Sequence, residues 1–115
     1  MSSHVPEPFS VSATLHAGTA TISPVGEVDL DTHWRVREAI REHIGAGAER
    51  VVLDLRKVTF MDPSGLHLVL DLEAESRRGA FSFAIVPGGA EVQRLFDLVT
   101  EGHRLTFVEP GDAAS

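Results

Sequence analysis

One short run of apolar residues constrains the fold more than any other segment of the sequence. Val51-Val52-Leu53-Asp54-Leu55 is β-branched and apolar at consecutive positions, whereas a strand with one wet face alternates apolar and polar residues. Such a run is typical of a strand that is buried on both faces of a sheet. Val58-Thr59-Phe60-Met61 continues the run after a basic interruption, so we interpret the whole stretch as the central strand.

Two alternating segments near the start predict an antiparallel hairpin. Residues 9–15 and 20–25 alternate apolar and polar side chains, and residues 16–19 supply the turn between them. Pro24 weakens the end of the second strand, because proline lacks the N–H that a ladder needs.

Three segments predict helices. The first starts at an Asp31-Thr32 N-cap and stops at the glycines of residues 45–47, the second runs from Ser64 to about residue 78, and the third follows a turn at residues 87–89. Strands are predicted at 81–86 and 105–108. Strands that alternate with helices predict an α/β fold, a sheet with helices packed against it. Helical spacing is shown by Val36, Ile40, Ile44, Val92, Leu95, Phe96 and Val99.

Length and composition favour one soluble domain. The 115 residues suit one core over residues 9–109, and the aperiodic ends, 1–8 and 110–115, are predicted to be disordered tails. A net charge of −7 without a basic stripe argues against nucleic acid and favours a basic protein partner. Cysteine is absent, and apolar runs are too short for a membrane span, so we expect a cytoplasmic protein that does not bind membranes.

The segment from Asp62 to Leu66 takes the chain from a strand straight into a helix. Asp62 precedes a proline and suits the N-cap, while Pro63 at the first helical position lacks only a donor that would be orphaned anyway. We expect the amides of Ser64, Gly65 and Leu66 to stay free. Free amides and the positive end of the helix dipole stabilise an anion, including a phosphate on Ser64.

Three motifs in order along the chain resemble the STAS-domain family, and specifically the stand-alone bacterial anti-sigma-factor antagonists. They are Gly26-Glu27-Val28-Asp29, Asp62-Pro63-Ser64-Gly65-Leu66 and Arg94-Leu95-Phe96-Asp97-Leu98, and the resemblance extends over residues 9–109. It implies a mixed β-sheet of about five strands with helices packed against it.

The same resemblance implies a regulatory role without catalysis or a cofactor. In the family, the unphosphorylated antagonist binds an anti-sigma factor, commonly also an ATP-dependent serine kinase, and so frees the sigma factor. Phosphorylation at the helix start ends the complex. The resemblance makes Ser64 the candidate phosphorylation site. It places Glu27 and Asp29 near the docking surface and makes Asp62, Ser64 and Gly65 the switch. The candidate docking residues are Glu27, Asp29, Asp62, Pro63, Ser64, Gly65, Leu68 and Leu72.

This sequence departs from the family pattern at one position that matters. The family motif usually reads Asp-Ser-Ser-Gly or Asp-Ser-Thr-Gly, and Pro63 replaces the first hydroxyl, which is the phosphoacceptor. Either the acceptor has moved by one residue to Ser64, or this member is not switched. The proline also keeps open an alternative, in which a STAS-type module binds a small molecule or lipid, or acts as a scaffold in a transport or signalling assembly.

Other residues allow more than one interpretation. Leu68 and Leu72 widen the apolar arc of the second helix, which indicates either a deeply buried helix or an exposed apolar edge that a partner covers. Trp34 is expected in the core, with contact to a partner as the second interpretation. The six histidines form no metal-binding pair, and His67 near Ser64 gives only weak support for a hydrolase, because no nucleophile elbow is present.

Overall fold

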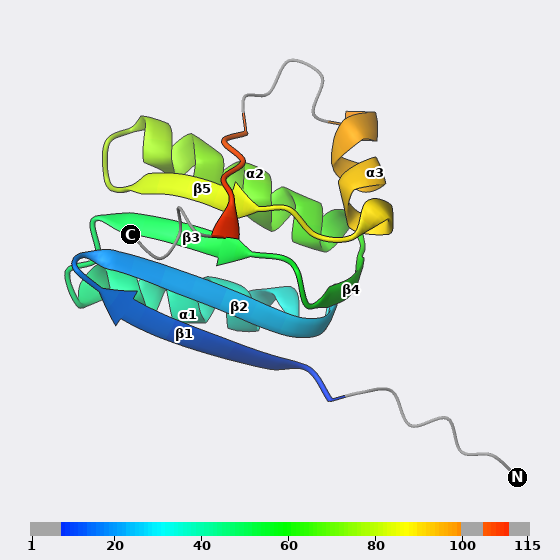
Figure 1. Cartoon of the computed structure of the whole chain (residues 1–115), viewed down its shortest axis with the longest axis horizontal. Helices are drawn as coiled ribbons and strands as arrows, with labels where there is room; N and C mark the ends of the chain where they lie inside the picture. The colour runs from blue at the N-terminus through cyan, green and yellow to red at the C-terminus, as the bar shows by residue number, and fades with distance from the viewer. Residues whose placement is uncertain (1–7, 100–104, 111–115) are drawn as a thin grey trace, which may run out of the picture.

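Strands and helices alternate along most of the chain, as the sequence predicts. The computed structural model describes residues 8–99 and 105–110, so residues 1–7 and 111–115 of the two predicted tails lie outside the described residues. The elements, in chain order (Figure 1), are β1 (Ser10–His16), β2 (Thr19–Val28), α1 (His33–Gly45), β3 (Arg50–Asp54), β4 (Val58–Met61), α2 (Pro63–Arg77), β5 (Ser82–Val86) and α3 (Ala90–Val99).

The five strands form one mixed sheet, which confirms the predicted fold class. Strands β1 and β2 are an antiparallel hairpin whose turn contains Ala17 and Gly18, both with positive φ. The strand order is β1-β2-β3-β5, and β4 pairs with β2 beyond the end of β3. The β2–β3, β2–β4 and β3–β5 pairs are all parallel.

Strand β2 is longer than predicted because it pairs with two strands in succession. Its residues up to Ile22 pair with β3, and those from Gly26 pair with β4. Pro24 falls in the interval between them, where neither β3 nor β4 is in register, so the strand continues through the proline. The prediction that residues 58–61 continue the central strand is wrong, because a turn at Arg56 and Lys57 moves them over to β2 as a separate strand.

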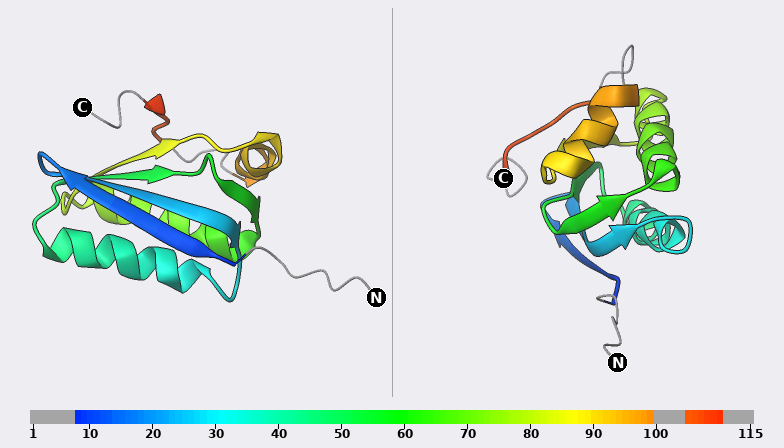
Figure 2. Two further views of the ribbon diagram at one scale, coloured as in Figure 1. Left: turned by 60° about the horizontal axis from the view of Figure 1, so that its bottom comes forward. Right: turned by 90° about the vertical axis from the view of Figure 1, so that its right-hand side faces the viewer.

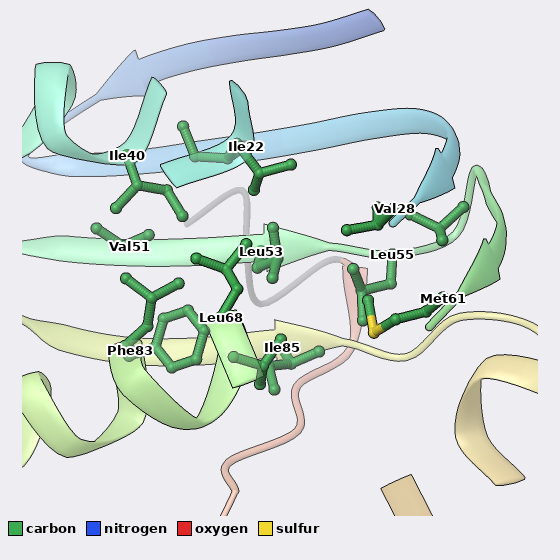
Figure 3. Packing of buried hydrophobic residues seen from close by; sticks show 14 of the residues in the cluster. Ile22, Val28, Ile40, Val51, Leu53, Leu55, Met61, Leu68, Phe83 and Ile85 are labelled. Atoms are coloured by element: carbon green, nitrogen blue, oxygen red, sulfur yellow. The ribbon is translucent and has the colours of Figure 1, made fainter. Parts of the chain in front are cut away.

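Helices α1 and α2 cover one face of the sheet, and α3 lies at the end next to β4 (Figure 2). Val36 and Ile40 of α1 are buried, in agreement with their spacing. Figure 3 shows Leu68 of α2 beside Leu53 and Ile85 of the sheet. Of the two interpretations of Leu68 and Leu72, the deeply buried helix is confirmed and the partner-covered edge is wrong, since both side chains are fully buried in this core.

The opposite face of the sheet carries no helix among the described elements. There Val108, in the segment after α3, packs against Val52 and Val86. The predicted last strand is reduced to a single parallel bridge between Phe107 and Ile85. No helix in the described ranges is both long and apolar enough to span a bilayer.

Two ion pairs one helical turn apart connect α1 to α2. Arg37 contacts Asp71 at 3.1 Å, and Arg41 donates two hydrogen bonds to the carboxylate of Glu75. These hydrogen bonds lower the pKa of Glu75, and burial opposes the shift only in part. The pair therefore contributes to stability only while Glu75 is ionised.

The first turn of α2 lies unusually close to the end of β2. A Cβ atom at Gly65 would lie 2.6 Å from Cγ of Met61 and 2.9 Å from Cγ1 of Val28. The amide of Asp62 also donates to the carbonyl of Val28 at 3.1 Å. Only glycine permits this approach, so Gly65 determines where the start of α2 sits relative to the sheet.

We expect Gly65→Ala to lower the free energy of unfolding by about 1–3 kcal/mol, the usual cost of overpacking, despite the better helix propensity of alanine. Gly45→Ala is the matched control, because a Cβ there meets nothing within 4 Å and the residue ends α1. Urea denaturation of both variants measures the difference. Equal free energies of unfolding for Gly65→Ala and Gly45→Ala would show that the backbone at Gly65 relaxes freely.

The Arg41–Glu75 pair predicts a pH dependence. Because the folded pKa of Glu75 lies below its ordinary value of 4.5, the contribution is complete above that pH and is lost as the pH falls through the folded pKa. Glu75→Gln should lower the free energy of unfolding by up to about 1 kcal/mol at neutral pH, a small amount because both groups are partly solvated. At about pH 3 the decrease should be smaller. Glu38→Gln on α1 serves as control. A cost for Glu75→Gln that does not change with pH would contradict this.

Candidate functional site

The candidate docking residues meet where two parallel strands end. Strands β2 and β4 run in the same direction, so the residues after Val28 and after Met61 emerge at the same edge of the sheet. Glu27 is exposed near the end of β2, and Asp29 follows that strand directly. The structure thus brings both next to the segment Asp62–Gly65, as the sequence motifs suggest.

Asp62 caps helix α2, as its position before a proline predicts. Its Oδ1 accepts hydrogen bonds from the amides of Ser64 at 2.8 Å and Gly65 at 3.2 Å. The amide of Leu66 donates to the backbone carbonyl of Asp62 at 3.2 Å. The expectation that these three amides stay free is therefore wrong, because the capping carboxylate already occupies the place of an anion.

Ser64 lies in the first turn of α2 and is partly exposed. Within the described ranges its hydroxyl makes no hydrogen bond, so it is available to another molecule. His67 is exposed, and no hydrogen bond joins it to Ser64 in the part of the chain that the structure describes. The geometry therefore gives no support to a serine nucleophile activated by this histidine.

The loop between β2 and α1 is held in place by Asp29 and Thr32. The hydroxyl of Thr32 donates to the carbonyl of Glu27 at 2.7 Å and to Oδ1 of Asp29 at 3.1 Å. It also accepts from the amide of Asp29 at 2.9 Å. Thr32 occupies the predicted N-cap position of α1, but its side chain makes no capping bond because it stabilises this loop instead.

Four large apolar side chains, on the β2–α1 loop, α1, β4 and α3, are exposed, and sequence reasoning missed them as a group. Trp34 was expected in the core but is 52% exposed, with Nε1 donating to the carbonyl of Asp31. Leu30 is 70% exposed in the same loop. On the other side, Phe60 is 46% and Leu98 is 74% exposed. The exposure of Leu98 could have been predicted from its position outside the apolar stripe of α3.

Phe60 and Leu98 border a mainly apolar hollow between β4 and α3. The cavity measures about 220 Å³ and is lined by Phe60, Met61, Glu91, Arg94, Leu95 and Leu98. Figure 2, right, shows the end of the molecule where the start of α2 lies between the start of α1 and α3. Leu30 and Trp34 belong to α1 and the loop before it, and Phe60 and Leu98 belong to β4 and α3. We call these four side chains (Leu30, Trp34, Phe60, Leu98) the apolar rim.

The carboxylates of this surface give it an acidic character. Glu27 and Asp31 are exposed, and Asp29 and Asp62 are partly exposed. No cluster of three or more His, Asp or Glu side chains in the described ranges is arranged to hold a metal ion. The surface offers apolar contact beside negative charge, which suits a partner with the opposite charge.

Comparisons with known proteins agree with this architecture. The family model of the STAS domain matches residues 10–108. The chain is 31% identical over 94 residues to the anti-sigma-F factor antagonist RsfB of Mycobacterium tuberculosis, an alignment that covers 82% of this chain and 76% of the relative.

Solved structures share the fold at lower identity. An anti-sigma factor antagonist from Mycobacterium paratuberculosis superposes with a TM-score of 0.77 at 24% identity, covering 96% of this chain and 94% of that one. The anti-sigma factor antagonist SpoIIAA in its unphosphorylated form gives 0.72 at 23% identity, covering 93% of each chain. The family match and the relative above 30% identity lead to one assignment: the chain belongs to the STAS domain family.

Proposed function

We propose that this protein is an anti-sigma-factor antagonist that docks onto an anti-sigma factor through the surface around the start of α2. The observation that carries the proposal is Ser64 itself, in the first turn of α2, partly exposed and with its hydroxyl unpartnered among the described residues. The start of this helix lies between the start of α1 and α3 (Figure 2). The relative RsfB, whose name describes an anti-sigma-F factor antagonist, supports the class of partner.

The apolar rim supplies the contact area that docking requires. Aromatic side chains are enriched at protein interfaces, and exposed apolar side chains that gather in one region mark interaction surfaces. Four of the six large apolar side chains that are exposed in the described ranges belong to this rim. Leu68 and Leu72 have no part in docking, because they are buried.

Phosphorylation of Ser64 would add charge to a surface that is already acidic. A phosphate contributes roughly −1.5 to −2 charges near neutral pH. Because Asp62 already accepts from the amides of Ser64 and Gly65, a phosphate would remain beside that carboxylate without free amides to neutralise it. The phosphate would therefore weaken binding, because a partner would have to remove water from its charge. The partner is proposed to carry an ATP-dependent serine kinase domain.

The first test compares Ser64→Asp with Ser64→Ala. We expect Ser64→Asp to weaken binding to the cognate anti-sigma factor much more than Ser64→Ala, because the aspartate adds charge at the interface. The alanine should cost at most the ~0.5–1.5 kcal/mol of one hydrogen bond. Titration calorimetry measures both affinities, with circular dichroism to check folding. Equal affinities for the wild type and both variants would remove Ser64 from the interface.

The second test concerns Pro63. We expect Pro63→Ser to incorporate more phosphate than the wild type when incubated with the kinase and ATP, because the usual acceptor position regains a hydroxyl. Pro63→Ala is the matched control, since it removes the ring and adds no acceptor. Intact mass and peptide mapping identify the modified residue. Equal incorporation by the wild type and Pro63→Ser would show that Pro63 does not limit the reaction.

A further inference from the structure

A polar cavity on the helix-free face of the sheet is separate from the proposed docking surface. It measures about 240 Å³ and is lined by Ser12, Ser23, Asp54, Arg56 and Lys57. Ser12 and Ser23 lie opposite one another in the β1–β2 register. Because Leu53 points into the helix-covered core, its neighbour Asp54 points to the other face, beside Ser23. Arg56 and Lys57 reach the cavity from the turn between β3 and β4.

Asp54 and Arg56 form a pair that leaves part of the guanidinium unused. Asp54 is only 8% exposed, and it accepts from Nε of Arg56 at 3.0 Å and from Nη2 at 2.7 Å. Burial alone would raise the pKa of Asp54, but the hydrogen bonds and charge of Arg56, aided by Lys57, outweigh it and lower that pKa. The carboxylate is thus ionised and its charge is balanced. Nη1 of Arg56 has no partner in the described ranges.

Lys57 adds a second positive charge beside Asp54, which already forms an ion pair with Arg56, so these three side chains together carry one net positive charge. The carbonyl of Lys57 accepts from the amide of Gly26 at 3.1 Å, which fixes the backbone of the turn. Its ammonium makes no hydrogen bond or ion pair with the residues that the structure describes. The hydroxyl of Ser23 is likewise unpartnered there, and that of Ser12 makes only a 3.4 Å contact with the carbonyl of Ser23. On a protein of net charge −7, this is a local cationic site.

We propose that this cavity binds a small phosphate monoester. Lys57 and the free Nη1 of Arg56 hold the phosphate, and the hydroxyls of Ser12 and Ser23 bind polar groups of the attached alcohol. The fork of Arg56 is already engaged by Asp54, so the site lacks the bidentate geometry that favours planar carboxylates. A compact dianion gains more from the point charge of Lys57. Drug-sized ligands occupy roughly 300–1,000 Å³, so this volume suits a smaller molecule.

NMR titration with glycerol 3-phosphate at low ionic strength and about pH 7.5, where the phosphate is a dianion, tests the site. We expect saturable shifts of the amides of Ser12, Ser23 and Lys57, with uncharged glycerol producing none. Lys57→Gln should raise the dissociation constant severalfold, up to about fivefold, the effect of losing one solvent-exposed charge pair. Arg78→Gln removes the same charge at the far end of α2 and should leave binding unchanged.

A variant that leaves the charge unchanged distinguishes binding in the cavity from non-specific attraction between charges. Ser23→Leu fills the space without altering charge and should abolish the shifts, while circular dichroism verifies its fold. The proposal is overturned by wild-type shifts that do not saturate by about 20 mM, by equal weakening in Lys57→Gln and Arg78→Gln, or by unchanged binding in a folded Ser23→Leu. The assay contains no anti-sigma factor, so its outcome is independent of the docking proposal.

Discussion

The close approach of Gly65 to Val28 and Met61 is the contact on which the rest of the site depends. It seats the first turn of α2 against the ends of β2 and β4, and the bond from the amide of Asp62 to Val28 fixes the chain just before it. The start of α2, which contains Ser64, then lies between the start of α1 and α3 (Figure 2). A larger residue at position 65 would move the cap, the serine and the apolar rim relative to one another.

Much of the fold could be predicted from local patterns, because hydrophobic periodicity reports which face of an element is buried. The hairpin, the helices and the runs of β3 and β5 follow from it. Strand β4 could not be predicted as a separate strand from this periodicity. Its apolar residues follow β3 so closely that only the long-range pairing with β2 separates the two strands. The burial of Trp34 and Leu68 could not be predicted for a related reason. The type of a side chain does not show whether another part of the fold covers it.

The candidate site was predictable in position more than in detail. Glu27, Asp29 and Asp62 were identified by motif, and parallel pairing of β2 with β4 accounts for their proximity. The amides of the helix start were expected to be free, although the sequence also indicates Asp62 as their cap. A cap and an anion compete for the same donors, and the structure assigns them to Asp62. The apolar rim draws on three separate segments of the chain, so no single segment could reveal it.

The central position of β2 has a consequence for how the chain assembles. This strand contacts β1 across a tight turn at Ala17-Gly18, but β3 and β4 only after the whole of α1 has intervened. Closing a short loop costs less entropy than closing a long one, so the hairpin is the part of the sheet that can form first. The parallel strands then add to a β2 that is already ordered. The proposed docking surface includes residues at the ends of β2 and β4, and it is therefore completed late in folding.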